Sequence, residues 1–130
     1  MPVLRKAPTE AELAILRVLW ERGPSTVREV HCALYEGTEI GYTTALKLLQ
    51  NLLAKGLVAR DQKTRQHIYS ALAPRERTLN QHVRAWIDRT FGGSSAALAM
   101  QALDAKPARP EELGKLKKLI RKIEQRERGH

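Results

Sequence analysis

The chain has 130 residues, with 23 Lys and Arg against 14 Asp and Glu, which gives a formal net charge of +9. This length suits one globular domain with an extension, and the charge favours a polyanionic partner or an acidic protein surface. The single cysteine, Cys32, excludes an internal disulfide and favours a reducing compartment. No apolar run is long enough to cross a membrane, and the N-terminus lacks the apolar region of a signal peptide. We therefore expect a soluble, cytoplasmic protein that does not insert into membranes.

Two capping boxes predict the first two helices. Thr9 and Glu12 frame the first, which is expected to run to about Arg22, where Gly23-Pro24 stops it. The stretch Thr-Val-Arg-Glu at residues 26–29 opens a second helix that extends to about residue 36. The apolar side chains expected inside are Leu13, Leu16, Leu19 and Trp20 in the first helix and Val27, Val30 and Leu34 in the second.

A third helix, at residues 41–56, organises the rest of the chain. Gly41 is an acceptable N-cap, and Gly56 stands where a helix end calls for a left-handed residue. One face is apolar at helical spacing and consists of Ala45, Leu48, Leu49 and Leu52. The other face has no acid and consists of Thr43, Thr44, Lys47, Gln50 and Asn51. Hydroxyls, amides and an ammonium bond phosphates and base edges, although an ordinary solvated helix is also polar outside.

After Gly56 the pattern changes from helical to strand-like. Short strands are predicted at residues 57–61 and 67–71, joined by a polar turn at 62–66. A helix, a glycine stop and a basic hairpin follow one another in a winged helix-turn-helix, where the helix enters the major groove and the hairpin follows the DNA backbone. The cationic side chains of this hairpin are Arg60, Lys63, Arg65 and His67. We predict that the helix reads bases, chiefly through Lys47, Gln50 and Asn51, and that the wing holds phosphate.

The distribution of charge along the chain agrees with this prediction of DNA binding. Residues 7–39 contain three Arg and six Glu, a net charge of −3. Residues 40–65 contain five Lys and Arg and one Asp, a net charge of +4. This division predicts a DNA side and an acidic back side. Residues 1–7 are expected to form a disordered arm whose Arg5 and Lys6 are free to touch phosphate.

Pro74 is predicted to divide the chain into a winged-helix DNA-binding domain, residues 1–74, and a helical domain, residues 75–130. The fold expected is therefore mainly α with a small β-wing. Three helices are expected in the second domain, over residues 75–91, from 94 or 95 to 106, and from Pro110 onward.

The three C-terminal helices carry more apolar side chains than a stalk can bury, and the last has apolar spacings of three, four and three, as in a coiled coil. We interpret them as a dimerisation domain; the alternative is that they fold back on the first domain. The residues expected to join two copies are Trp86, Phe91, Leu98, Leu103, Leu116, Ile120 and Ile123.

No arrangement of residues indicates catalysis, a cofactor or a metal. A Ser-His-acid set, a phosphate-cradling glycine loop and metal-spaced His and Cys residues are all absent from the sequence. His31 is expected to be packed or half-packed on the second helix. Cys32 is expected on the outer face, as a passive thiol without a resolving cysteine. We predict that the protein is not an enzyme.

Several stretches together carry a family resemblance. They are Val-Leu-Trp-Glu-Arg-Gly-Pro at 18–24, Thr-Val-Arg-Glu-Val-His at 26–31, Tyr-Thr-Thr at 42–44, Lys-Gly-Leu-Val at 55–58, Tyr69 and Phe-Gly-Gly at 91–93. In these stretches, and from residue 8 to about residue 124, the chain resembles the penicillinase-repressor family (the BlaI/MecI type). The resemblance implies a homodimeric winged-helix repressor on an inverted-repeat operator, in front of resistance or related genes.

The resemblance also implies a partner and a cleavage region. Some members are released from DNA when a membrane sensor-protease system causes their cleavage in the tail. Gln101-Ala102 stands where those relatives have an Asn-Phe bond, so the cleavage region here differs in sequence. The chain lacks the terminal cysteine cluster of the copper-responsive branch. Leu46 occupies a DNA-contacting position of the third helix that is basic in some relatives, which bears on the operator sequence.

Two functions from different classes fit these observations. The first is a sequence-specific transcriptional repressor, favoured by the acid-free helix face. The second is a winged-helix protein-interaction module whose basic tail docks an acidic partner. Operator-length DNA that fails to shift at moderate salt would favour the second.

Overall fold

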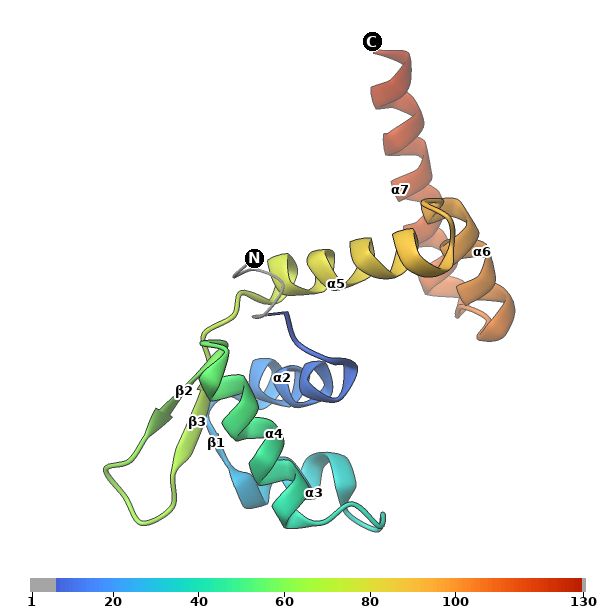
Figure 1. The fold of residues 1–130 in the computed structure, drawn as a ribbon. Helices are drawn as coiled ribbons and strands as arrows, with labels where there is room; N and C mark the ends of the chain where they lie inside the picture. Colours follow the sequence, from blue (N-terminus) through green and yellow to red (C-terminus); the bar gives the residue numbers. More distant parts are fainter. Residues whose placement is uncertain (1–6, 130) are drawn as a thin grey trace. The chain divides into compact units, whose positions relative to one another are not determined.

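The computed structural model describes residues 7–129, in two compact units that join within one helix (Figure 1). The first unit extends to Ala85 and the second begins at Trp86. The expected phosphate contacts of Arg5 and Lys6 lie outside the described residues, and the division at Pro74 stays a prediction. Across residues 7–129, no helix has both the length and the apolar character needed to cross a membrane.

Three helices form the body of the first unit: α2 (Glu10–Arg22), α3 (Val27–Tyr35) and α4 (Tyr42–Ala54). Both predicted capping boxes are confirmed. The Thr9 hydroxyl accepts from the Glu12 N–H at 3.2 Å, and the Glu12 carboxylate accepts from the Thr9 N–H at 2.9 Å. Thr26 and Glu29 make the same pair of bonds at the start of α3. These caps satisfy N–H groups that a helix start otherwise leaves unpaired.

A three-stranded antiparallel sheet flanks the helices, in the order β1 (Ser25–Thr26), β3 (Ile68–Ala71), β2 (Val58–Asp61). Tyr69 of β3 lies opposite both Ser25 and Arg60. The β2–β3 hairpin is the predicted wing. β1 was not predicted, because a two-residue strand shows no alternation and is defined only by its pairing with β3. Three helices followed by such a hairpin make a winged helix.

The core of the first unit is a single cluster centred on α2. Its buried members are Ile15, Leu16, Val18, Leu19, Val27, Val30, Ala45, Leu49, Leu52, Val58 and Tyr69. Ile15 and Val18 were not among the expected core residues; they are buried because α2 packs against α3, α4 and β3 and so has more than one apolar face. The expected core residues Leu13, Trp20, Leu34 and Leu48 are half-buried at the edge of the cluster.

Helix α5 (Arg75–Thr90) starts against the first unit. The Thr78 hydroxyl donates to the Pro74 carbonyl at 2.6 Å, and the indole Nε1 of Trp20 donates to the Ala73 carbonyl at 3.0 Å. The chain leaving the sheet is therefore held by side-chain hydrogen bonds to two successive carbonyls, those of Ala73 and Pro74.

The second unit contains the end of α5, α6 (Ser95–Ala105) and α7 (Pro110–Arg128). The Ser94 hydroxyl caps α6 by accepting from the Ala97 N–H at 3.0 Å. The rings of Trp86 and Phe91 meet edge to face with centroids 5.6 Å apart. Neither α6 nor α7 buries a side chain. The unit therefore leaves many of its large apolar side chains partly in contact with solvent.

Candidate nucleic-acid interface

Helix α4 presents a polar face because its other face is fixed in the core. Ala45, Leu49 and Leu52 are buried, and no acid occurs in the first turn or elsewhere in the helix. The side chains left exposed are Tyr42, Thr43, Thr44, Lys47, Gln50 and Asn51. All the predicted polar contact residues of this helix therefore share one solvent-facing side.

The loop before α4 is held by polar contacts. His31 Nε2 donates to the Ile40 carbonyl at 2.7 Å. The Thr38 hydroxyl donates to the Tyr35 carbonyl at 2.6 Å and accepts from the Ile40 N–H at 3.2 Å. His31 is half-buried, as expected, and Cys32 is exposed. The start of α4 is thereby tied to α3.

An ion pair fixes the other end of α4. Lys55 Nζ lies 2.5 Å from a Glu12 carboxylate oxygen and donates to the Ala7 carbonyl at 3.1 Å. The Glu12 side chain is 3% exposed and that of Lys55 is 23% exposed. Gly56 follows with φ +78°, a conformation that glycine adopts without the strain a Cβ would bring. One carboxylate thus caps α2 and anchors α4.

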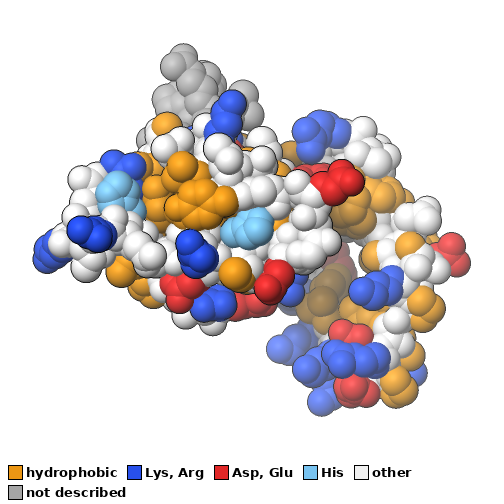
Figure 2. Space-filling model, turned by 90° about the horizontal axis from the view of Figure 1, so that it is seen from below, with side chains coloured by type: hydrophobic (Ala, Val, Ile, Leu, Met, Phe, Trp, Pro, Cys, Tyr) orange, Lys and Arg blue, Asp and Glu red, His pale blue; other side chains and the backbone are white. Residues whose placement is uncertain are grey.

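The wing leaves its cations free by using its acid internally. The Asp61 carboxylate accepts from the Lys63 N–H at 2.9 Å, and the Thr64 hydroxyl donates to the Gln66 carbonyl at 2.5 Å. Lys63, Arg65 and His67 are exposed. Arg60 is half-buried, and the Gln62 amide, oriented to accept, places its oxygen 3.0 Å from Arg60 Nε. Figure 2 shows Lys and Arg side chains and a histidine gathered over the wing, at the left.

The start of α3 lies beside this wing. The Thr26 backbone N–H, followed by the Thr26 hydroxyl and the Arg22 guanidinium, holds the pKa of Glu29 below its ordinary value. Arg28, which precedes Glu29 in the same turn, is exposed and was not among the predicted contacts. The signal in the sequence was its position in the first turn of a helix that follows a capping threonine.

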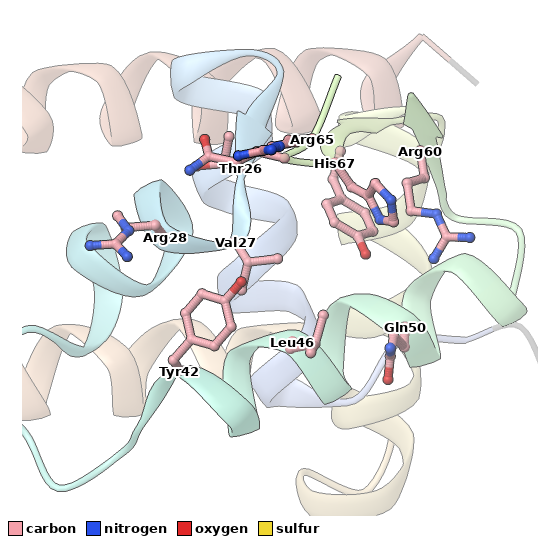
Figure 3. Close-up of a pocket in the computed structure, with 11 residues that line it drawn as sticks. Thr26, Val27, Arg28, Tyr42, Leu46, Gln50, Arg60, Arg65 and His67 are labelled. Atoms are coloured by element: carbon pink, nitrogen blue, oxygen red, sulfur yellow. The ribbon is translucent and has the colours of Figure 1, made fainter. Parts of the chain in front are cut away.

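A hollow of about 340 Å³ lies between α4, the start of α3 and the wing (Figure 3). It brings together Leu46, Gln50, Arg60, Arg65 and His67, which the sequence placed on separate elements. The other lining residues are Thr26, Val27, Arg28, Tyr42, Gln66 and Tyr69. Lys47, Asn51 and Lys63 lie outside the hollow, on the exposed surfaces of helix and wing. In the described part of the chain, no group of three or more His, Cys, Asp or Glu residues could hold a metal ion.

The family model for penicillinase repressors matches residues 8–122 of the chain. The chain belongs to the penicillinase-repressor family. This family consists of transcriptional regulators, which are not enzymes. The match covers α2 to α4, the wing and most of the C-terminal helices, so it includes residues of both units.

Two curated relatives are named transcriptional regulator BlaI and come from Mycobacterium tuberculosis, strains CDC 1551 / Oshkosh and ATCC 25618 / H37Rv. Each is 38% identical to the chain over 68 residues, which is 52% of this chain and 49% of the relative. The chain thus spans about half the length of these curated relatives.

Solved structures support the winged-helix fold. A MarR family protein from Bacillus stearothermophilus matches with a TM-score of 0.51 and 21% identity, over 91% of this chain and 74% of that one. YusO from Bacillus subtilis matches with a TM-score of 0.53 and 18% identity, over 95% and 79%. At these identities the likeness concerns the fold of this penicillinase-repressor family member, not its ligand or target.

Proposed function

We propose that the chain is a sequence-specific transcriptional repressor that binds an inverted-repeat DNA operator as a homodimer. The observation that carries this proposal is the acid-free exposed face of α4 beside a wing of unpaired cations. Within residues 7–129, none of Lys47, Lys63 and Arg65 forms a salt bridge. Free cations beside hydroxyl and amide groups are what phosphate and base-edge contacts require.

The roles proposed for helix and wing differ, so they can be tested separately. Gln50 and Asn51 read bases, and their replacement by alanine should cost about 1–3 kcal/mol on the operator and relax base preference. Lys63 and Arg65 hold phosphate, and their replacement by alanine should weaken all DNA alike and lower the salt slope by about one unit. Equal loss of specificity from both pairs would refute this division.

Footprinting on DNA upstream of the protein's own gene would supply the operator for these measurements. A footprint of two half-sites about 34–36 Å apart, or a multiple of that, is expected from two recognition helices on one DNA face. The target genes that the family name suggests are resistance genes, and the position of the footprint tests this part of the proposal. Absence of any shift at moderate salt would favour a protein-interaction module instead.

The dimer is proposed from the second unit. Its exposed apolar side chains include Trp86, Met100, Leu103, Leu113, Leu119, Ile120 and Ile123. The remaining predicted contacts, Phe91, Leu98 and Leu116, are half-buried. Large apolar side chains exposed in this number favour a protein interface, and in the proposed dimer a second copy buries them while doubling the number of base contacts.

Ile120→Asp tests the dimer. Ile120 is 55% exposed, so the carboxylate remains hydrated in the monomer, whereas a dimer would bury it without a partner. The variant should sediment as a monomer at micromolar concentration and lose operator specificity while the first unit stays folded. Lys118→Gln lowers the charge by one unit without removing an apolar side chain and should remain dimeric. A monomeric wild type, or a dimeric Ile120→Asp variant with full operator affinity, would refute the proposal.

The proposal for induction rests on the family resemblance: a membrane sensor-protease system causes cleavage of the chain at Gln101-Ala102. If this is so, co-expression of the chain with that system should give a truncated product. An intact chain under inducing conditions would argue for release by another route.

A further inference from the structure

The hollow between α4 and the wing has the size and the mixed surface of a small-molecule site. Its volume of about 340 Å³ falls at the lower end of the range of ligand pockets, about 300–1,000 Å³. Val27 and Leu46 contribute apolar surface, and Figure 3 shows Leu46 of α4 and Val27 of α3 on facing sides. A phosphate group alone would leave much of this space and its apolar lining unused.

The charged side chains of the lining are all arginines. Arg28, Arg60 and Arg65 come from three separate segments, and no Asp or Glu of the described part of the chain lines the hollow. Within residues 7–129, none of these three arginines forms a salt bridge. Arginine forks bind carboxylate and other oxyanions through paired hydrogen bonds. The hollow therefore suits an anion with an apolar body.

Tyr69 supplies an independent sign of a ligand. Its side chain is 0% exposed and lines the hollow, and its hydroxyl has no hydrogen-bond partner among residues 7–129. Buried polar groups nearly always have a partner, and leaving a hydroxyl without one destabilises the free protein. Phenylalanine would fill the same core position without that penalty, so the hydroxyl calls for an acceptor supplied from outside the chain.

We propose that this hollow binds a small organic anion, such as an aromatic carboxylate, whose oxygen accepts from the Tyr69 hydroxyl and pairs with an arginine. Because Leu46, Gln50 and Arg65 are also proposed DNA contacts, the bound anion competes with DNA and acts as an inducer. The competition rests on the proposed function; the binding site does not.

Titration of the full-length ¹⁵N-labelled protein with sodium benzoate tests the site without DNA. Benzoate should cause saturable shifts of the amides around the hollow, and sodium acetate at the same ionic strength should cause much smaller ones. Tyr69→Phe should weaken benzoate binding by about tenfold, as expected for a lost hydrogen bond to a charged group, while its melting temperature stays equal or rises. Arg28→Gln, an exposed change outside the proposed DNA contacts, should also weaken it severalfold. No saturable shift, equal shifts with acetate, or unchanged binding to Tyr69→Phe would overturn the site.

Fluorescence anisotropy with a labelled DNA duplex tests the competition. Benzoate should lower DNA affinity more than acetate does in the wild type, and this excess should vanish in Tyr69→Phe. DNA affinity without benzoate should be the same in both proteins. If Tyr69→Phe alone binds DNA weakly, the hydroxyl serves a DNA phosphate and the proposal of a free anion is overturned. A protein that binds benzoate as described but no DNA would refute the proposed function and leave the site standing.

Discussion

Replacing Lys55 with methionine removes the charge that balances Glu12 while keeping the length of the side chain. The Glu12 carboxylate, at 3% exposure, cannot reach water without unpacking α2 from α4, and it keeps only the capping bond to the Thr9 N–H. Removing one partner of a buried pair costs about 3–5 kcal/mol. Because Lys55 is 23% exposed, we expect about 2–4 kcal/mol here.

Glu12→Gln is the informative counterpart. It keeps an acceptor for the Thr9 N–H, and the ammonium left behind can turn towards solvent, so we expect a loss of about 1 kcal/mol. The double variant should be less destabilised than the sum of the two single changes, because it has no unpaired charge.

Urea denaturation of the full chain, followed by far-UV circular dichroism, measures these differences. For a domain of this size, Lys55→Met should also lower the melting temperature of the first unit by about 10–20 °C. Equal effects of Lys55→Met and Glu12→Gln, or strict additivity in the double variant, would refute the view that Glu12 is the trapped partner.

Two further changes test local features of the first unit. Gly56→Ala should destabilise it by about 1–2 kcal/mol in urea, because φ is +78° at this residue. Gly41→Ala, at φ −94° and with open space around the added Cβ, loses only the preference for glycine over alanine at an N-cap and should cost about 0.5 kcal/mol; equal costs would contradict the backbone argument. The lowered pKa of Glu29 stabilises the fold above the ordinary value of 4.5, and this contribution is lost as the pH falls through the lowered pKa. Glu29→Gln should therefore flatten the acid side of the stability profile, while Glu36→Gln, the same charge change at the other end of α3, should leave its shape intact.

Local signals in the sequence predicted the helices well. Thr9, Thr26 and Gly56 each act within a few residues, and the helix ends they predicted lie within one or two residues of those in the structure. The wing was predicted because the apolar period changes abruptly after Gly56. Such signals depend on neighbouring residues only, so they can be read without knowledge of the fold.

Apart from Arg28, the features that were missed depend on distant residues. β1 exists only because Ser25 lies opposite Tyr69, and Glu12 was identified as a cap but not as the partner of Lys55. The predicted contacts on helix and wing are exposed, except for the half-buried Leu46 and Arg60, but no sequence period shows that Leu46 and Arg65 line one hollow. Burial of the Tyr69 hydroxyl is likewise a property of packing, since tyrosine in a strand is equally suited to a solvent-facing position.

Gln101-Ala102 lies inside α6, and a protease binds its substrate as extended chain, so this peptide bond resists cutting while the helix is intact. α6 has 11 residues and buries none of its side chains, and a helix this short is marginal by itself in water. Cleavage would then follow the fraction of time that α6 is unwound. In the proposed dimer a partner copy covers Leu98 and Leu103 and keeps the helix wound. A protease that cuts at this bond would therefore act chiefly on dissociated chains, and newly made or diluted repressor would be degraded first.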